Sequence, residues 1–396
     1  MSSRINDVTG VIEREVAAIE PRLIEIRRDI HAHPELGHET PRTSNLVAEE
    51  LKDMGLSPRT GVGGHGVTAE IQGTAGPGPT ILIRADMDAL PMEEHTGLSF
   101  ASTIPGRMHA CGHDIHTATL LGVGRILAGI SANLRGSIRL VFQPAEETIE
   151  SGAKRMVADG AAEGASIALG FHNNPDLPVG KFGFVRGAVY ASGDEFDIVV
   201  KGRSGHAARP NEALDPIVAA AAIIMQLQTI ISRSVDPLAP AVLTIGQIKG
   251  GTAFNIIPES CFLEGTIRCR SAESRALMKQ RLHQVCHSTA EAMGMKCEIN
   301  FMPGCPPEVN DDDILNAVTS AFERQFGEHS LVECKGEFGT EDFSYFTELM
   351  PSAHMFIGSS QPGRTDQLHN SDYQPDEGCI AQGVAALSRA VFDLMS

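Results

Sequence analysis

The sequence predicts an α/β fold class, a domain with a mostly parallel central sheet flanked by helices, plus an inserted α+β domain. Two observations predict it. Up to about Gly187, short apolar runs rich in β-branched residues alternate with helical patterns, as in sheets built from strand-helix-strand units. Beyond Gly187, strand-like runs alternate polar and apolar residues, which is typical of a sheet with one face in solvent.

The elements of the first part follow from their hydrophobic spacing. Two amphipathic helical patterns open the chain, and strand-like runs follow with helical patterns between them. The predicted helices span 11–28, 44–54, 116–130 and 152–159, and the predicted strands span 80–84, 137–142 and 166–171.

The second part predicts a β-α-β-β-α unit, and the chain then returns to the pattern of the first part. The unit comprises strands at 195–201, 241–248 and 261–268 and helices at 215–232 and 272–293, followed by helices at 312–326, 342–349 and 378–395 and a strand at 354–357. A chain of 396 residues is long for one core. We therefore expect an inserted domain at 187–302 within a large domain formed by 1–186 and 303–396.

Composition excludes several classes of partner. The formal net charge of -18 disfavours nucleic acids and anionic membrane surfaces. No run approaches the ~18 apolar residues of a membrane span, and the N-terminus lacks the apolar stretch of an export signal. The eight cysteines form no CxxC pair, so we expect a reducing cytoplasm and no disulfide framework.

Polar clusters follow each predicted strand of the large domain. The strand at 80–84 leads into Asp86 and Asp88, the strand at 137–142 into Glu146 and Glu147, and the strand at 166–171 into His172. The run MHACGHDIH places Cys111 and His113 before a predicted helix. Because parallel strands present functional groups at their carboxyl ends, these residues are expected to converge at one sheet edge, where thiolate, imidazole and carboxylate groups suit metal ions.

Neighbouring carboxylates suit a division of labour between Glu146 and Glu147. One can bind a metal ion, while the other acts as general base on a water that the metal acidifies. The free carboxylate then carries the proton to the leaving amine, since an amide anion is too basic to leave unaided.

The sequence resembles the hippurate hydrolases and N-acyl-amino-acid or auxin-conjugate amidohydrolases, relatives of aminoacylase and glutamate carboxypeptidase. The resemblance runs over nearly the whole chain. It rests on the motifs at 31–39, 84–91, 109–116, 143–147, 205–210, 251–259, 265–268, 339–344 and 369–370.

The resemblance implies two divalent metal ions in the large domain, with zinc, manganese, cobalt and nickel as candidates. The implied ligands are Cys111, His113, Glu147, His172 and His369. Glu146 is the implied acid/base, and Asp86 and Asp88 are expected to orient the ligands from behind. His369 lies far beyond His172 in the sequence, as an inserted domain between them requires.

The resemblance also implies a role in dimerisation and as a lid for the inserted domain. His206 would stabilise the oxyanion in the site of a neighbouring subunit, while Asn255 and Arg268 would bind the substrate carboxylate. We therefore expect a homodimer or a higher homo-oligomer that hydrolyses small N-acyl amino acids to a carboxylic acid and a free amino acid.

The sequence bears on four alternatives to this interpretation. A metal-dependent dipeptidase or carboxypeptidase on the same scaffold remains open, because an N-acyl amino acid and a dipeptide differ mainly in a free α-amine. A Cys111 nucleophile with His113 as base lacks an obvious third orienting group. An inactive metal-binding protein would have lost the base or a ligand, and neither is missing. Nucleotide binding fails because the chain has no GxxxxGK[ST] motif and no GxGxxG after a strand.

Overall fold

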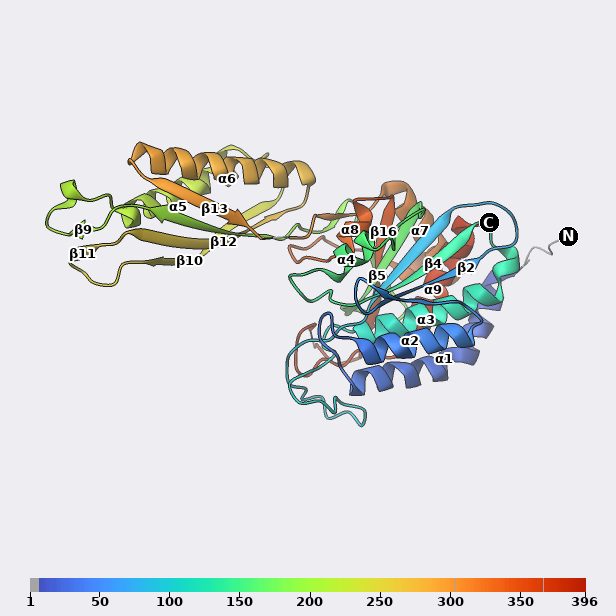
Figure 1. Cartoon of the computed structure of the whole chain (residues 1–396). Coiled ribbons are helices and arrows are strands. Elements are labelled where there is room, and N and C mark those ends of the chain that lie inside the picture. The colour runs from blue at the N-terminus through green and yellow to red at the C-terminus, as the bar shows by residue number, and fades with distance from the viewer. Residues whose placement is uncertain (1–6, 303, 366) are drawn as a thin grey trace. The chain divides into compact units, whose positions relative to one another are not determined.

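The computed structural model describes residues 7–302, 304–365 and 367–396, which form two compact units (Figure 1). Unit 1 comprises the chain up to Gly187 together with Val309–Lys335 and Asp342–Ser396, and unit 2 comprises Ala188–Glu308 and Gly336–Glu341. The predicted division placed 303–308 and 336–341 in the large domain, because neither segment carries a periodic apolar pattern. Residues 1–6, 303 and 366 of the predicted large domain lie outside the described residues.

The described residues of unit 1 contain a mixed sheet whose centre is parallel. Its strands β4, β3, β5 and β16 lie in that spatial order and pair in parallel, as the alternating elements predict. The full order is β1 (Arg59–Val62), β2 (Gly66–Gln72), β4 (Ser137–Gln143), β3 (Thr80–Asp86), β5 (Ile167–Pro178), β16 (Ser352–Ser360), β6 (Phe182–Phe184) and β15 (Leu331–Glu333). Strands β1, β2, β6 and β15 were not predicted.

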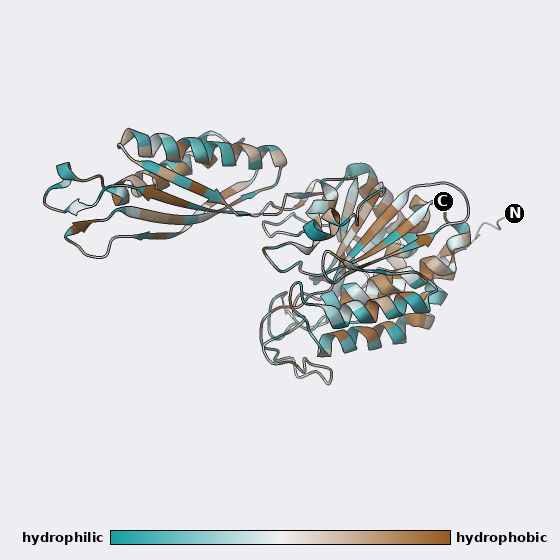
Figure 2. Ribbon diagram, in the orientation of Figure 1, coloured by the Kyte–Doolittle hydropathy of each residue, from teal (hydrophilic) through white to brown (hydrophobic). Residues whose placement is uncertain are grey.

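Helices cover both faces of this sheet (Figure 1). Alternation along β3 sends Ile81 and Ile83 into the larger apolar cluster and Leu82 into a second cluster with Phe343 and Phe346. Brown colouring concentrates along these strands in Figure 2. The helices are α1 (Val8–Ala32), α2 (Pro41–Asp53), α3 (His113–Gly129), α4 (Gly152–Ala158), α7 (Asp312–Phe326), α8 (Ser344–Thr347) and α9 (Gly378–Leu394), with short 3-10 turns at Ser131–Asn133 and Glu328–Ser330.

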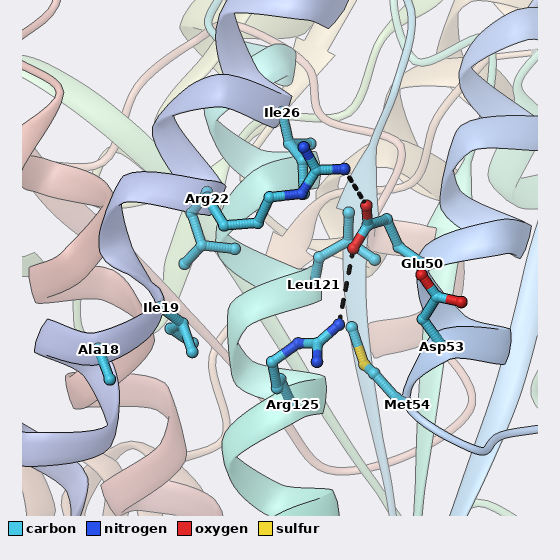
Figure 3. Close-up of a pocket in the computed structure, with 10 residues that line it drawn as sticks. Ala18, Ile19, Arg22, Ile26, Glu50, Asp53, Met54, Leu121 and Arg125 are labelled. Atoms are coloured by element: carbon cyan, nitrogen blue, oxygen red, sulfur yellow. Dashed lines mark hydrogen bonds and ion pairs between the residues drawn. The ribbon is translucent and has the colours of Figure 1, made fainter.

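A pocket of about 230 Å³ lies between α1, α2 and α3 (Figure 3). Its central charge is the carboxylate of Glu50, which accepts a hydrogen bond of 2.6 Å from Arg22 and lies 3.6 Å from Arg125. Arg22, Glu50 and Arg125 therefore pair with one another and tie the three helices together.

Unit 2 contains an antiparallel four-stranded sheet in the order β10 (Ala241–Gly250), β12 (Ser260–Cys269), β8 (Asp194–Lys201) and β13 (Lys296–Phe301). Its helices are α5 (Pro216–Arg233) and α6 (Ala272–Ala292). Strand β13 extends the predicted β-α-β-β-α unit by one element, in which Cys297, Ile299 and Phe301 alternate with polar residues. Shorter elements are β7 (Ala188–Tyr190), β9 (Gly205–His206), β11 (Ile256–Ile257), β14 (Glu308–Val309) and a 3-10 turn at Pro210–Glu212.

Among the described residues, α5 is the one helix that is long and apolar enough to cross a membrane by length and composition. Its residues Ala219, Ile223, Leu227 and Ile230 are buried in the core of unit 2. A core helix passes the same test, so this packing already explains the apolar character of that face.

Candidate metal centre

The metal-binding residue types of unit 1 lie where its parallel strands end. Strand β3 ends at Asp86, β4 ends just before the loop with Glu146 and Glu147, and His172 lies on β5. The segment that carries Cys111 leads into α3, which begins at His113. The C-terminal part of the chain supplies His369, whose backbone N–H donates to the carbonyl of Ala110 at 2.9 Å.

The structure brings the five predicted ligands into overlapping groups. The candidate ligand atoms of Cys111, His113 and His172 lie within 4.8 Å of one another, and the same holds for Cys111, Glu147 and His369. The sulfur of Cys111 is 3.4 Å from Nε2 of His172, and Nε2 of His369 is 3.1 Å from Oε1 of Glu147. Cys111 is common to both groups, so the described side chains offer two adjacent ion positions that share one thiolate.

Buried polar atoms in these groups fit a cation. Both ring nitrogens of His113 are buried without a hydrogen-bond partner, and the buried Oε1 of Glu147 has an ion-pair contact with His369 at 3.1 Å. Nε2 of His113 lies 3.9 Å from that oxygen. Unpartnered buried polar atoms are costly, and a divalent ion between imidazole, thiolate and carboxylate groups would satisfy them.

The pKa values of Cys111 and His113 also favour a bound cation. Burial raises the pKa of the Cys111 thiol well above its ordinary value, and the charges of Glu147 and Glu146 raise it further. Burial alone would lower the pKa of His113, but Asp86, Asp88 and Glu147 raise it to about 10. A bound divalent ion reverses both tendencies, because it favours the thiolate and the neutral imidazole.

His172 is already held in the form that binds a metal. Burial lowers its pKa well below the ordinary value. Its Nδ1 lies 2.7 Å from the carbonyl oxygen of Asn173. A neutral imidazole that donates from Nδ1 presents Nε2 as the free acceptor.

Three residues at or beside the predicted ligands have a backbone with positive φ. Gly112 has φ 91°, and a Cβ there would lie 1.9 Å from Oδ1 of Asn173, so only glycine fits between Cys111 and His113. Among the residues that the structure describes, two other than glycine also have positive φ, Ala145 at 58° and His369 at 61°. Such conformations are sparsely populated and cluster at functional sites.

The two predicted orienting carboxylates contact the ligand segments. The oxygens of Asp88 accept from the backbone N–H of Glu146 at 3.0 Å and of Glu147 at 3.2 Å, and Oδ1 lies 3.5 Å from Nδ1 of His113. Asp88 therefore holds the glutamate loop beside the imidazole.

Asp86 contacts His116, a histidine for which the sequence predicted no chemical role. Nε2 of His116 accepts from the backbone N–H of Asn173 at 2.9 Å, so Nδ1 carries the proton that Asp86 accepts at 2.6 Å. Sequence reasoning also passed over Arg84, Gln143, Asn173, Asp342 and Tyr373, which hydrogen-bond around this core.

His206, Asn255 and Arg268 belong to unit 2, whereas the ligand groups belong to unit 1. His206 lies on β9, is exposed, and pairs with Ile256 of β11. The carbonyl of Asn255 accepts from the N–H of Ala207 at 3.1 Å, which places Asn255 in the same small element as His206. Arg268 lies on β12 in the four-stranded sheet.

Two proteins of known name are similar in sequence to most of this chain. N-acetyl-L-cysteine deacetylase from Bacillus subtilis is 40% identical over 379 residues, which cover 95% of this chain and 89% of the relative. The IAA-amino acid hydrolase ILR1-like 2 from Arabidopsis thaliana is 37% identical over 368 residues, covering 92% of this chain and 83% of the relative.

A solved structure from Bacillus subtilis, described as a dinuclear metal-binding peptidase from the M20 family, matches with a TM-score of 0.84 and 35% identity, covering 96% of this chain and 99% of that one. Residues 82–393 match the sequence model of the family described as peptidase family M20/M25/M40. Since this match spans more than half of the sequence, the chain belongs to the M20/M25/M40 peptidase family.

Proposed function

We propose that this protein is a metal-dependent amidohydrolase that cleaves N-acyl amino acids to a carboxylic acid and a free amino acid, with two divalent ions held by Cys111, His113, Glu147, His172 and His369. The observation that carries the proposal is the pair of ligand groups that share Cys111. A deacetylase of an N-acetyl amino acid and a hydrolase of an amino acid conjugate among the relatives support this substrate class.

The side chains divide the reaction between them. When bound, the ions supply Lewis acidity that polarises the scissile carbonyl and acidifies a water. We assign to Glu146 the transfer of the proton from that water to the amine nitrogen, because Glu147 lies 3.1 Å from His369 and 3.9 Å from His113 and serves as a ligand. Asp88 holds the backbone of both glutamates, so the base and the ligand keep a constant spacing.

The donor set bears on the identity of the ions. A thiolate and two or more imidazoles favour zinc, whereas the carboxylates also suit manganese, cobalt or nickel. We assign two divalent ions from this group.

We further propose that the protein is a homodimer in which unit 2 serves both dimerisation and closure over the substrate. Strand β10 is an edge of its sheet, and its Ile248 is 51% exposed. On α5, Val218 and Met225 are 57% and 70% exposed. An apolar face of this kind beside an unpaired strand edge suits a second copy of the chain.

In this dimer, His206 would stabilise the oxyanion in the site of the partner subunit, with Asn255 and Arg268 binding the substrate carboxylate. Exposure of His206 and Asn255 on one small element of unit 2 supports such a role, because both side chains are free to meet another molecule. A cytoplasmic location is consistent with eight cysteines that are all free.

A second candidate function is hydrolysis of dipeptides or of the C-terminal residue of peptides. The structural relative described as a peptidase favours it. The two candidates differ in whether the site accepts a free α-amine next to the scissile bond.

The deciding experiment is a hydrolysis panel of N-acetyl, N-benzoyl, indolyl-acetyl and fatty-acyl amino acids beside dipeptides. The protein is first stripped with a chelator, and Mn²⁺, Zn²⁺, Co²⁺ or Ni²⁺ is then added separately. We expect no activity without metal and restored cleavage of N-acyl amino acids with at least one ion. Full activity after exhaustive chelation would exclude the mechanism, and a preference for dipeptides would establish the second function.

A further inference from the structure

Arg84 forms a buried ionic contact at the end of β3. Its side chain is 1% exposed. Nη1 donates to Asp86 at 2.8 Å, Nε donates to Gln143 at 2.8 Å, and Nη2 donates to Asp342 at 2.7 Å. Arg84 thus joins Asp86, which orients His116, to a carboxylate from the C-terminal part of unit 1.

Asp342 also holds both ends of the glutamate loop, defined as residues 144–150 between β4 and the cap of α4. Before the loop, Nε2 of Gln143 donates to the Asp342 oxygens at 2.7 and 2.8 Å. After the loop, the hydroxyl of Ser151 donates to Oδ2 at 2.7 Å and the N–H of Ala153 donates to it at 3.1 Å. Glu146 and Glu147 lie between these anchors.

Asp342 is also the residue at which the chain re-enters unit 1 after Gly336–Glu341 of unit 2. The residue that follows it, Phe343, is fully buried in the apolar cluster on one face of the sheet. The carboxylate of Asp342, 1% exposed, is therefore anchored by packing as well as by hydrogen bonds.

We propose that Asp342 is a positioning residue that sets the placement of Glu146 and Glu147 by holding Gln143, Arg84 and Ser151 together. This inference rests on the proposed function, in which Glu146 moves the proton and Glu147 binds an ion. Its physical basis is that the Asp342 carboxylate accepts hydrogen bonds from Arg84, Gln143, Ser151 and Ala153, while a carboxylate oxygen of Glu146 lies within 4.8 Å of it. Only an acceptor group satisfies these donors together.

The variant Asp342→Asn keeps the shape and replaces one acceptor oxygen with a donor. Either orientation of the amide leaves donors of Gln143, Ser151 or Arg84 facing an NH₂ group, so the loop loses an anchor. A matched control is Asp194→Asn in unit 2. Asp194 is also fully buried and accepts from Arg275 and Lys279, but its contacts do not reach the glutamate loop.

Hydrogen exchange of peptides that cover 144–153 tests the proposal directly, in both the metal-free and the metal-loaded protein. We expect Asp342→Asn to exchange roughly tenfold faster in this segment, and Asp194→Asn to leave it at the wild-type rate. In the cobalt-loaded protein, Asp342→Asn should also shift the visible absorption of the ion, and its kcat should fall about 10–100-fold with little change in KM.

A second variant, Gln143→Met, keeps the proposal testable if Asp342→Asn does not fold. It retains the Asp342–Arg84 ion pair and nearly the same volume, and it should increase exchange in 144–153 by a smaller factor. Wild-type exchange of this segment in Asp342→Asn, or an equal increase in Asp194→Asn, would overturn the proposal. Hydrogen exchange needs neither substrate nor metal, so the result stands even if the panel of N-acyl amino acids shows no hydrolysis.

Discussion

Nε2 of His369 lies 3.1 Å from Oε1 of Glu147, although all of unit 2 intervenes between them in the sequence. The contact depends on the return of the chain to unit 1, where the backbone of His369 is held against Ala110 beside Cys111. The candidate metal centre is therefore assembled from the first and the last of the three sequence segments of unit 1, and each of its residues can be tested separately.

Replacement of Cys111 tests the shared ligand. Cys111→Ser exchanges an anionic soft ligand for a neutral hydroxyl, so the protein should bind less metal. Metal content by elemental analysis after dialysis measures this, with Cys286→Ser as control, because Cys286 is equally buried but lies in the core of unit 2. Unchanged occupancy in Cys111→Ser would remove the thiol from the ligand set.

The two neighbouring glutamates should respond differently to the same substitution. Glu146→Gln should keep near wild-type metal content while turnover falls by ~10²–10⁴, the range of general acid–base catalysis. Glu147→Gln should lose metal as well, because it removes the charge that lies next to His369 and His113. Paired metal analysis and steady-state kinetics check this, and the reverse pattern would exchange the two roles.

Gly112 should not tolerate a side chain. In Gly112→Ala, the Cβ meets Oδ1 of Asn173 at 1.9 Å and φ stays at 91°, so we expect a loss of about 1–3 kcal/mol in the free energy of unfolding from backbone strain and weaker metal binding. Denaturant titration and metal analysis measure both. In the control Gly129→Ala, at the other end of α3, a Cβ meets nothing within 4 Å, so stability should be unchanged or slightly higher.

Unit 2 should lose stability in acid through Asp194. Burial alone would raise the pKa of this carboxyl, but Arg275 and Lys279 lower it below the ordinary value. A lowered pKa means that the stabilisation is present above the unfolded pKa of about 3.9 and is lost as pH falls through the folded value. At neutral pH, Asp194→Asn should lower the free energy of unfolding by about 1–3 kcal/mol.

Urea titrations of wild type and Asp194→Asn from neutral pH down to strongly acidic pH check this prediction. The gap between the two proteins should narrow as the carboxyl takes up its proton. A gap that stays constant over the whole pH range would show that the ion pair contributes nothing to stability.

A complementation experiment tests whether His206 acts on the partner subunit. Glu146→Ala and His206→Ala proteins are unfolded together and refolded at equal concentrations. Random pairing makes about half of the dimers heterodimers, each with one site that carries both changes and one that carries neither, so about a quarter of wild-type activity should return. If His206 acts within its own subunit, the mixture stays inactive although a tag pull-down confirms heterodimers.

The sequence by itself determined the elements with regular apolar spacing. Strand β3 and helix α7 lie within two residues of their predicted ends or coincide with them, because a buried strand and an amphipathic helix carry their own hydrophobic period. The convergence of the polar residues that follow the parallel strands could also be predicted, because the carboxyl ends of parallel strands meet at one edge of the sheet.

The tertiary structure decided what depends on contacts between distant segments. Strand β1 has only four residues and carries little side-chain pattern, and pairing with β2 holds it in the sheet. Arg84, Gln143 and Asp342 lie far apart in the sequence, and no sequence motif predicts that their side chains contact one another. Their contact arises because β3, β4 and the segment before α8 converge, and the burial of charge there requires that each donor find an acceptor.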